Sequence, residues 1–101
     1  TKKLPFSSKL AIDTLANVCT AFGCKPIVVY IPNSEFWSPD SRSKAYAGLL
    51  SDYSAEKRTL FLDMSEYLRP LGDDAYARKG HHLSPRGYRV VADKIAQQLI
   101  D

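Results

Sequence analysis

Histidine, cysteine and methionine are scarce in this chain of 101 residues, which has two histidines, two cysteines and one methionine. The cysteines, Cys19 and Cys24, have four residues between them, a spacing that is typical neither of zinc sites nor of thioredoxin-like motifs. The histidines are adjacent, at 81 and 82, and neighbouring positions rarely both reach one ion. With no further histidine to complete a ligand set, the sequence predicts no metal site.

Long apolar runs and a strong charge of one sign are also missing. No apolar run reaches the roughly 18 residues that a transmembrane helix needs, and no signal peptide is recognisable. Net charge is +3, from 14 basic and 11 acidic residues, and no basic stripe with interleaved aromatic residues occurs. The sequence therefore predicts neither a transmembrane segment in this chain nor a nucleic-acid partner.

A first helix is predicted from Ser7-Ser8, which can cap its start, to Gly23, which suits its end. An apolar stripe at helical spacing is expected to form its buried face: Ala11, Leu15, Val18 and Phe22. Cys19 and Cys24 flank the predicted helix end. We expect them to be two buried thiols, because a disulfide across that end, the alternative, is geometrically awkward.

Two short apolar runs predict strands that are buried on both faces. Residues 27–31 (IVVYI) and 59–64 (TLFLDM) are rich in apolar side chains and do not alternate with polar ones. Such runs are typical of the strands of parallel sheets.

Two further helices are predicted from cap-plus-proline pairs, Ser38-Pro39 and Ser84-Pro85. The helix after Ser38 has its expected buried face at Tyr46, Leu49, Leu50 and Tyr53. The last helix has its expected inner face at Val91, Ile95 and Leu99. A short helical turn is expected at 65–68, and residues 69–80 are expected to form an irregular loop.

The predicted order helix, strand, helix, strand, helix indicates the α/β class with parallel strands and right-handed crossovers. It corresponds to part of a doubly wound, flavodoxin-like three-layer sandwich. Two parallel strands need neighbours on their edges and helices on both faces. We therefore expect residues 1–101 to form a single unit that is a piece of a larger domain. The alternative is a small α/β protein that self-associates through its strand edges.

The stretch 80–88 (GHHLSPRGY) places both histidines in a loop before the last predicted helix. Loops at the ends of α/β elements often carry functional sites. A histidine there can act as a general base near neutral pH, although a lone loop histidine is more often a surface residue.

Residues 82–88 and the helix after them resemble the last block of the SGNH (GDSL-type) hydrolases. In that family Asp-x-x-His is followed by a short polar residue two places after the histidine, by Gly or Ala five places after it, and by a C-terminal helix. His82, Ser84 and Gly87 match this pattern. Residues 27–32 resemble the family's strand that ends in proline, and residues 59–63 resemble its last strand.

The resemblance implies the C-terminal portion of a serine ester hydrolase or acyltransferase that acts on acyl esters without a cofactor. His82 would take the proton of the serine. The family's Gly-Asp-Ser block is absent, so the serine would come from a missing upstream part of the same protein or from a second chain. Many members act in the bacterial envelope, and the resemblance favours that compartment.

One departure concerns the catalytic acid, because Lys79 stands where the family has aspartate. A lysine cannot orient a histidine, and its charge would lower the basicity of the imidazole. Asp74, with Asp73 beside it, is the candidate replacement, whereas Asp63 is expected to be structural. If no acid replaces Lys79, the chain could instead belong to a catalytically degenerate module that binds a glycan or a protein.

Candidate binding residues follow the first predicted strand, where α/β proteins place their ligands. Asn33 and Trp37 are the two candidates, and Trp37 could stack on a sugar or cover an acyl pocket. The alternative is that Trp37, with Phe36, anchors a loop onto the fold. Ser84 is expected to cap its helix rather than act as a nucleophile.

Overall fold

The computed structural model describes residues 3–32, 41–79 and 82–100, with the side chains of residues 41–44 excepted. Two compact units make up the chain. The first unit comprises Thr1–Tyr30 and Pro39–Asp63, and the second comprises Ile31–Ser38 and Met64–Asp101. The single unit predicted for residues 1–101 as part of a larger domain stays a prediction.

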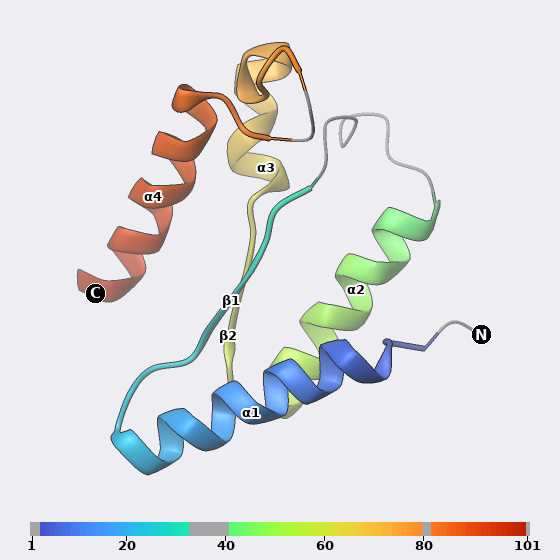
Figure 1. Cartoon of the computed structure of the whole chain (residues 1–101), viewed down its shortest axis with the longest axis vertical. Helices are drawn as coiled ribbons and strands as arrows, with labels where there is room; N and C mark the ends of the chain where they lie inside the picture. Colours follow the sequence, from blue (N-terminus) through green and yellow to red (C-terminus); the bar gives the residue numbers. More distant parts are fainter. Residues whose placement is uncertain (1–2, 33–40, 80–81, 101) are drawn as a thin grey trace. The chain divides into compact units, whose positions relative to one another are not determined.

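Helices and strands alternate in the first part of the chain, and only helical elements follow the second strand (Figure 1). Their order is α1 (Phe6–Phe22), β1 (Ile27–Tyr30), α2 (Ser41–Glu56), β2 (Leu60–Asp63), α3 (Ser65–Leu68), the 3₁₀ helix η1 (Arg69–Ala75) and α4 (Pro85–Ile100). The predicted start of the second helix at Ser38-Pro39 lies outside the described residues.

The two strands pair in parallel, and α2 forms the crossover between them. The register aligns Ile27 with Leu60 and Tyr30 with Asp63. The predicted parallel pairing is thus confirmed, with strands slightly shorter than the apolar runs. A protein of mixed helices and parallel strands belongs broadly to the α/β class.

The core of the first unit lies between α1, α2 and one face of the sheet. Its buried members are Leu4, Ile12 and Leu50, against which Val28, Tyr30, Leu49, Tyr53 and Phe61 pack. Val28 and Phe61 are register partners, so they lie on the same face of the sheet. The predicted inner face of α2 is confirmed at Leu49, Leu50 and Tyr53, whereas Tyr46 is 37% exposed.

The predicted buried stripe of α1 is wrong. Ile12 and Cys19 are the buried residues of this helix, Leu15 is half-buried, and the other predicted stripe residues, Ala11, Val18 and Phe22, are exposed. Both sides of the helix carry apolar residues at helical spacing, so periodicity alone could not select the side that packs.

The predicted caps of α1 have opposite outcomes. Ser7-Ser8 do not cap the helix, which begins at Phe6 after Pro5 and has no side-chain cap. The Pro5 carbonyl accepts the N–H groups of Ser8 and Lys9 instead. Gly23 does end the helix, with a φ of 73° that suits glycine, and its N–H donates to the carbonyl of Cys19.

A disulfide joins Cys19 and Cys24, so the prediction of two buried thiols is wrong. The left-handed turn at Gly23 brings the two Cα atoms to 4.4 Å, a separation that a disulfide can span. Cys19 is buried and Cys24 is exposed.

The second unit packs α3 and η1 against α4. Its buried apolar residues are Met64, Leu68, Ala75, Tyr76, Leu83 and Val91. The prediction of an irregular loop for residues 69–80 is wrong in its first half, where the 3₁₀ helix η1 begins at Arg69, has Pro70 in its first turn and kinks at Gly72, with a φ of 54°.

The inner face predicted for α4 holds for its first half. Val91 is buried and Ile95 is half-buried, but Leu99 is 67% exposed, so the prediction for Leu99 is wrong. In the second unit α4 packs on α3 and η1, and these short elements bury only its N-terminal turns. Among the described residues no helix combines the length and the hydropathy that crossing a membrane requires.

Candidate active site

The loop that carries His82 is closed at its base by backbone pairing. Tyr76 and Leu83 form an antiparallel bridge, and the Ala77 N–H donates to the His82 carbonyl over 2.9 Å. Leu83 is buried, whereas His82 is exposed, as expected for neighbouring side chains of an extended segment. The backbone of His82 is thus fixed while its imidazole is accessible from solvent.

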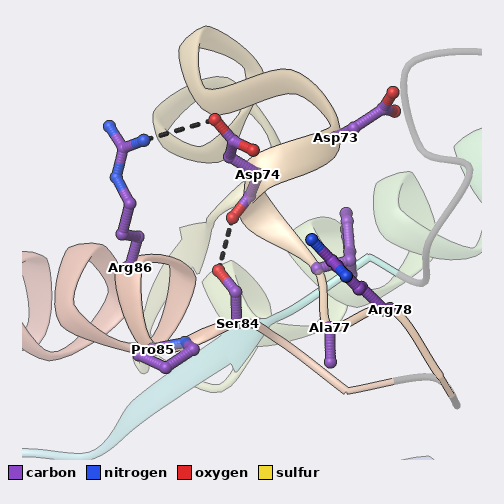
Figure 2. A pocket seen from close by; sticks show the side chains of 8 residues that line it. Asp73, Asp74, Ala77, Arg78, Ser84, Pro85 and Arg86 are labelled. Carbon is purple, nitrogen blue, oxygen red and sulfur yellow. Dashed lines mark hydrogen bonds and ion pairs between the residues drawn. The ribbon is translucent and has the colours of Figure 1, made fainter.

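Ser84 caps α4, as predicted. Its Oγ accepts the N–H of Gly87 over 3.1 Å, and its carbonyl accepts the N–H of Tyr88 over 2.9 Å. The same hydroxyl donates to the carbonyl of Asp74 (Figure 2). Because the hydroxyl proton and a lone pair are both engaged in structure, Ser84 is suited to capping rather than to nucleophilic attack.

Gly87 is buried where α4 meets the end of η1. A Cβ atom at this position would collide with the carbonyl oxygen of Ala75 and lie 3.2 Å from the Cβ of Leu83. Only a residue without a side chain allows this approach of α4. The glycine therefore sets how closely the helix start packs on the segments that flank the His82 loop.

Tyr76 anchors the same loop base on another side. Its hydroxyl donates to the carbonyl of Pro32 over 2.9 Å, and its side chain is 9% exposed. Pro32 follows the carboxyl end of β1 by two residues. The chain leaving β1 is thereby held against the loop that carries His82, and segments at this end of a strand commonly contribute to α/β sites.

A cavity of about 700 Å³ lies beside the loop (Figure 2). Its lining residues are Asp73, Asp74, Tyr76, Ala77, Arg78, Ser84, Pro85 and Arg86. Two guanidinium groups and two carboxylates give it mixed charge. Arg86 Nη1 lies 3.3 Å from Asp74 Oδ2, and both side chains are exposed. Such an exposed pair contributes little to stability.

The candidate acid and His82 are not joined in this structure. Between these two described residues there is neither a hydrogen bond nor an ion pair, and Asp74 is paired with Arg86 instead. Asp73 and Lys79 are exposed. The role of Asp74 as the acid stays a prediction.

The remaining candidates are Asp63, Asn33 and Trp37. Asp63 is exposed at the carboxyl end of β2, in register with Tyr30. Asn33 and Trp37, the candidate binding residues, lie outside the described residues. Within the described ranges, no three histidine, cysteine or acidic side chains cluster as metal ligands would.

Sequence reasoning gave no role to Tyr76 or to the two arginines that line the cavity, Arg78 and Arg86. The sequence did contain a signal for Arg86, because this residue directly follows the predicted helix start Ser84-Pro85 and therefore lies on the first turn of α4. The role of Tyr76 had no sequence signal, because it depends on a contact with Pro32, 44 residues away.

Comparison of the chain with protein-family models, with curated proteins and with solved structures found no match. A function for this chain is therefore inferred from the sequence pattern and from the geometry of the His82 loop.

Proposed function

We propose that this chain is the C-terminal portion of a serine ester hydrolase or acyltransferase of the SGNH type and that it supplies the catalytic histidine, His82. The supporting observation is the arrangement around the loop: an exposed imidazole directly precedes a helix that is capped by Ser84 and packed through Gly87. The three residues on which the resemblance depends thus have distinct physical roles: His82 is accessible from solvent, Ser84 caps α4, and Gly87 allows α4 to pack closely.

In the proposed reaction, His82 removes the proton of a serine hydroxyl while the serine oxygen attacks an ester carbonyl. Collapse of the tetrahedral intermediate breaks the bond to the leaving alcohol, which takes the proton from His82. Water or an acceptor alcohol then releases the acyl group by the same steps in reverse. Backbone pairing at the foot of the loop, which involves Ala77 and Tyr76, keeps the backbone of His82 in place throughout the reaction.

The serine and the oxyanion donors belong, in this proposal, to an upstream part of the same protein or to a second chain. The strands support such a partner. All four residues of β1 and three of the four of β2 are only half-buried, although their apolar sequences suit strands buried on both faces. The complete domain would be the doubly wound, flavodoxin-like sandwich of which this chain provides two strands.

A serine-directed fluorophosphonate probe tests this proposal on the purified protein. Intact mass spectrometry under denaturing conditions should find the probe on a polypeptide segment that carries a Gly-Asp-Ser block. Labelling of a serine within residues 1–101 would contradict the proposal, and so would a fully folded preparation without any labelled serine.

The second candidate function is a degenerate module that binds a glycan or a protein partner. It is favoured by one observation: Lys79 is exposed at the position of the family's acid, and Asp74, the candidate replacement, is paired with Arg86. Esterase activity of the Lys79→Asp variant distinguishes the two. Activity that appears only in this variant would support degeneration, whereas full activity of the unchanged protein would refute it.

A further inference from the structure

The cavity beside the His82 loop is bordered by two arginines that flank the histidine in the sequence. Arg78 lies four residues before His82 and Arg86 four residues after it, and both line the cavity (Figure 2). The hydrogen bond from the Ala77 N–H to the His82 carbonyl fixes the backbone next to Arg78. Arg86 belongs to the first turn of α4, which Ser84 caps. Two guanidinium groups are thus attached to ordered backbone at one cavity.

The charge of this part of the chain favours an anionic ligand. Between Asp74 and Asp93 the sequence contains four arginine or lysine residues and no acidic residue. A guanidinium group stays protonated at physiological pH, and its planar set of donors matches carboxylate and phosphate groups. Among the described residues Arg78 forms no ion pair. No described carboxylate therefore occupies its donors.

The pairing of Asp74 with Arg86 shows that a carboxylate can reach an arginine at this cavity. Asp74 Oδ2 lies 3.3 Å from Arg86 Nη1. The side chain of Arg86 is 68% exposed and that of Asp74 is 72% exposed, and so exposed a pair contributes little to stability. The anionic group of a ligand can therefore displace the Asp74 carboxylate from Arg86 at a small cost in stability.

The second acidic residue at the cavity, Asp73, leaves the arginines accessible. Figure 2 shows its carboxylate pointing away from Arg86 and Ser84. The residue is exposed to solvent, where salt screens its charge. Of the two acidic side chains that line the cavity, Asp74 is therefore the one that is placed to compete with a ligand for an arginine.

The cavity has room for more than a small ion. Its volume of about 700 Å³ lies within the range of roughly 300–1,000 Å³ that is usual for small-molecule sites. Tyr76, Ala77 and Pro85 line it together with the charged residues and provide apolar surface. A ligand that combines an anionic group with an uncharged part fits this lining.

We propose that this cavity binds a carboxylate or phosphate group through Arg78 and Arg86, and that this group belongs to the ester substrate of His82. The assignment to the substrate rests on the proposed ester chemistry, whereas the binding of an anion does not. Lys79, at the position of the family's acid, is exposed next to Arg78 in the chain and adds a further positive charge. The substrates are then acyl esters that also carry a carboxylate or a phosphate.

Titration of the protein with inorganic phosphate and with succinate, followed by NMR of the backbone amides, tests the anion site. Arg78→Gln and Arg86→Gln should each raise the dissociation constant by roughly tenfold, because each removes a charge-assisted contact. Arg89→Gln is the matched control, since Arg89 is exposed on α4 and is not among the residues that line the cavity. Its dissociation constant should stay within about twofold of that of the unchanged protein.

Asp74→Asn provides a change of the opposite sign. This variant removes the carboxylate that competes for Arg86, so the dissociation constant should fall by at least about twofold. Tighter binding of phosphate or of succinate identifies which group the site prefers, and either preference supports the site. The absence of saturable binding of both anions would overturn it, and so would equal dissociation constants in the unchanged protein and in both arginine variants.

Ester hydrolysis by a protein that also contains the Gly-Asp-Ser part tests whether the anionic group belongs to the substrate. The probes are two p-nitrophenyl esters, the neutral acetate and the hydrogen succinate, which carries a carboxylate. Arg86→Gln should raise the KM of the succinate ester relative to that of the acetate ester by roughly tenfold, with little change in kcat. Arg89→Gln should leave this ratio unchanged. An unchanged ratio in Arg86→Gln would overturn the assignment to the substrate.

The anion site and the ester chemistry fail in different ways. If the arginine variants lose phosphate binding while His82→Ala keeps full activity, the anion site is supported and the ester chemistry is wrong. If His82→Ala is inactive while both arginine variants bind phosphate and hydrolyse both esters like the unchanged protein, the ester chemistry is supported and the anion site is overturned.

Discussion

The carbonyl oxygen of Ala75 occupies the space where a side chain on Gly87 would begin. This contact joins the end of η1 to the first turns of α4. Together with the Tyr76–Leu83 bridge, it brackets the loop of His82. The position of the candidate base thus depends on a glycine five residues further along the chain, which the resemblance also singled out.

Replacing Gly87 by alanine should destabilise the protein by about 1–3 kcal/mol, because α4 must move away from Ala75 to admit the Cβ atom. This loss should exceed the gain in helix propensity of roughly 1 kcal/mol. Gly48→Ala in α2 is the matched control, since a Cβ there meets no atom within 4 Å. Urea unfolding measures the free energy of unfolding of both variants. A Gly87→Ala protein at least as stable as the unchanged one would contradict the described packing.

Removing the cap of α4 in Ser84→Ala should cost about 0.5–2 kcal/mol of stability. The Gly87 N–H would lose its acceptor, and the Asp74 carbonyl would lose its donor. Ser84→Thr keeps a hydroxyl and should retain most of the stability. Thermal unfolding measures the stability of both variants. An equal loss of stability in the alanine and threonine variants would show that the hydrogen bonds of the Ser84 hydroxyl do not stabilise the protein.

Stability should fall at high pH through the cluster of Asp13, Tyr53 and Lys57. The hydrogen bond to Asp13 raises the pKa of Tyr53, with burial as a smaller cause. The negative charge of Asp13 raises the pKa of Lys57. For both groups the folded pKa lies above the unfolded one, so their contribution is complete below the unfolded pKa values, near pH ~10. It is lost as the pH rises through the folded values.

The matched variant is Tyr53→Phe, which keeps the ring but removes the titrating hydroxyl. Its urea midpoint should fall less steeply than that of the unchanged protein as the pH is raised above about 10. Identical pH profiles for the two proteins would contradict a role of the Tyr53–Asp13 bond.

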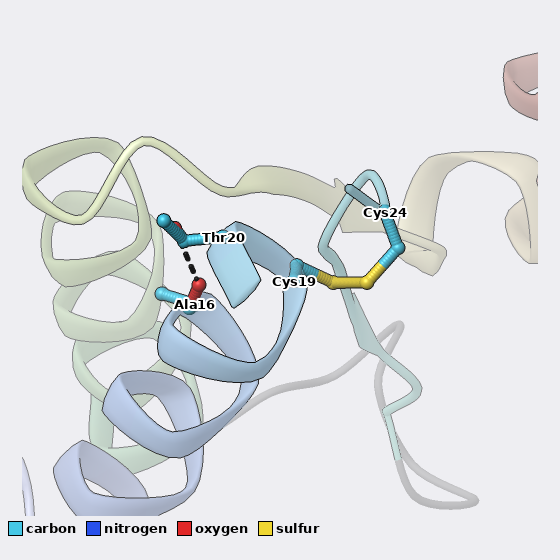
Figure 3. Close-up of a disulfide and its surroundings, with 4 residues drawn as sticks. All are labelled: Ala16, Cys19, Thr20 and Cys24. Carbon is cyan, nitrogen blue, oxygen red and sulfur yellow. Dashed lines mark hydrogen bonds between the residues drawn. A yellow bond between two sulfur atoms is a disulfide. The ribbon is translucent and has the colours of Figure 1, made fainter. Parts of the chain in front are cut away.

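Reduction of the Cys19–Cys24 disulfide (Figure 3) should lower stability by roughly 2 kcal/mol, the chain-entropy value for a loop this short. Helix α1 should nevertheless persist, because the N–H groups of Gly23 and Cys24 already donate to the Cys19 carbonyl. Unfolding in the presence and absence of a reductant measures the effect. The double variant Cys19→Ala/Cys24→Ala should not respond to reductant, which excludes an indirect effect.

Local sequence signals predicted the elements well and their surroundings less well. The strands, the glycine that ends α1 and the Ser84 cap depend on short-range chemistry, and the structure confirms them. The buried side of α1 depends on which of two apolar faces meets α2 and the sheet, and the disulfide depends on the turn at Gly23. Neither could be read from spacing alone.

In the candidate site, too, local sequence signals predicted the elements but not the contacts between distant residues. The exposed position of His82 before a capped helix follows from the local pattern. The pairing of Asp74 with Arg86 and the anchoring of Tyr76 on Pro32 join residues that are 12 and 44 positions apart. Such contacts depend on how α4, η1 and the chain after β1 pack, which no local pattern encodes.

The most direct test compares His82→Ala with His81→Ala in a protein that also contains the Gly-Asp-Ser part which the proposed function requires. Hydrolysis of p-nitrophenyl acetate is the readout, and circular dichroism checks the fold. If His82 is the catalytic base, its alanine variant should lose at least about a thousandfold in kcat/KM while His81→Ala keeps most of the activity. Equal activity of the His82→Ala variant and the unchanged protein would contradict the proposed function.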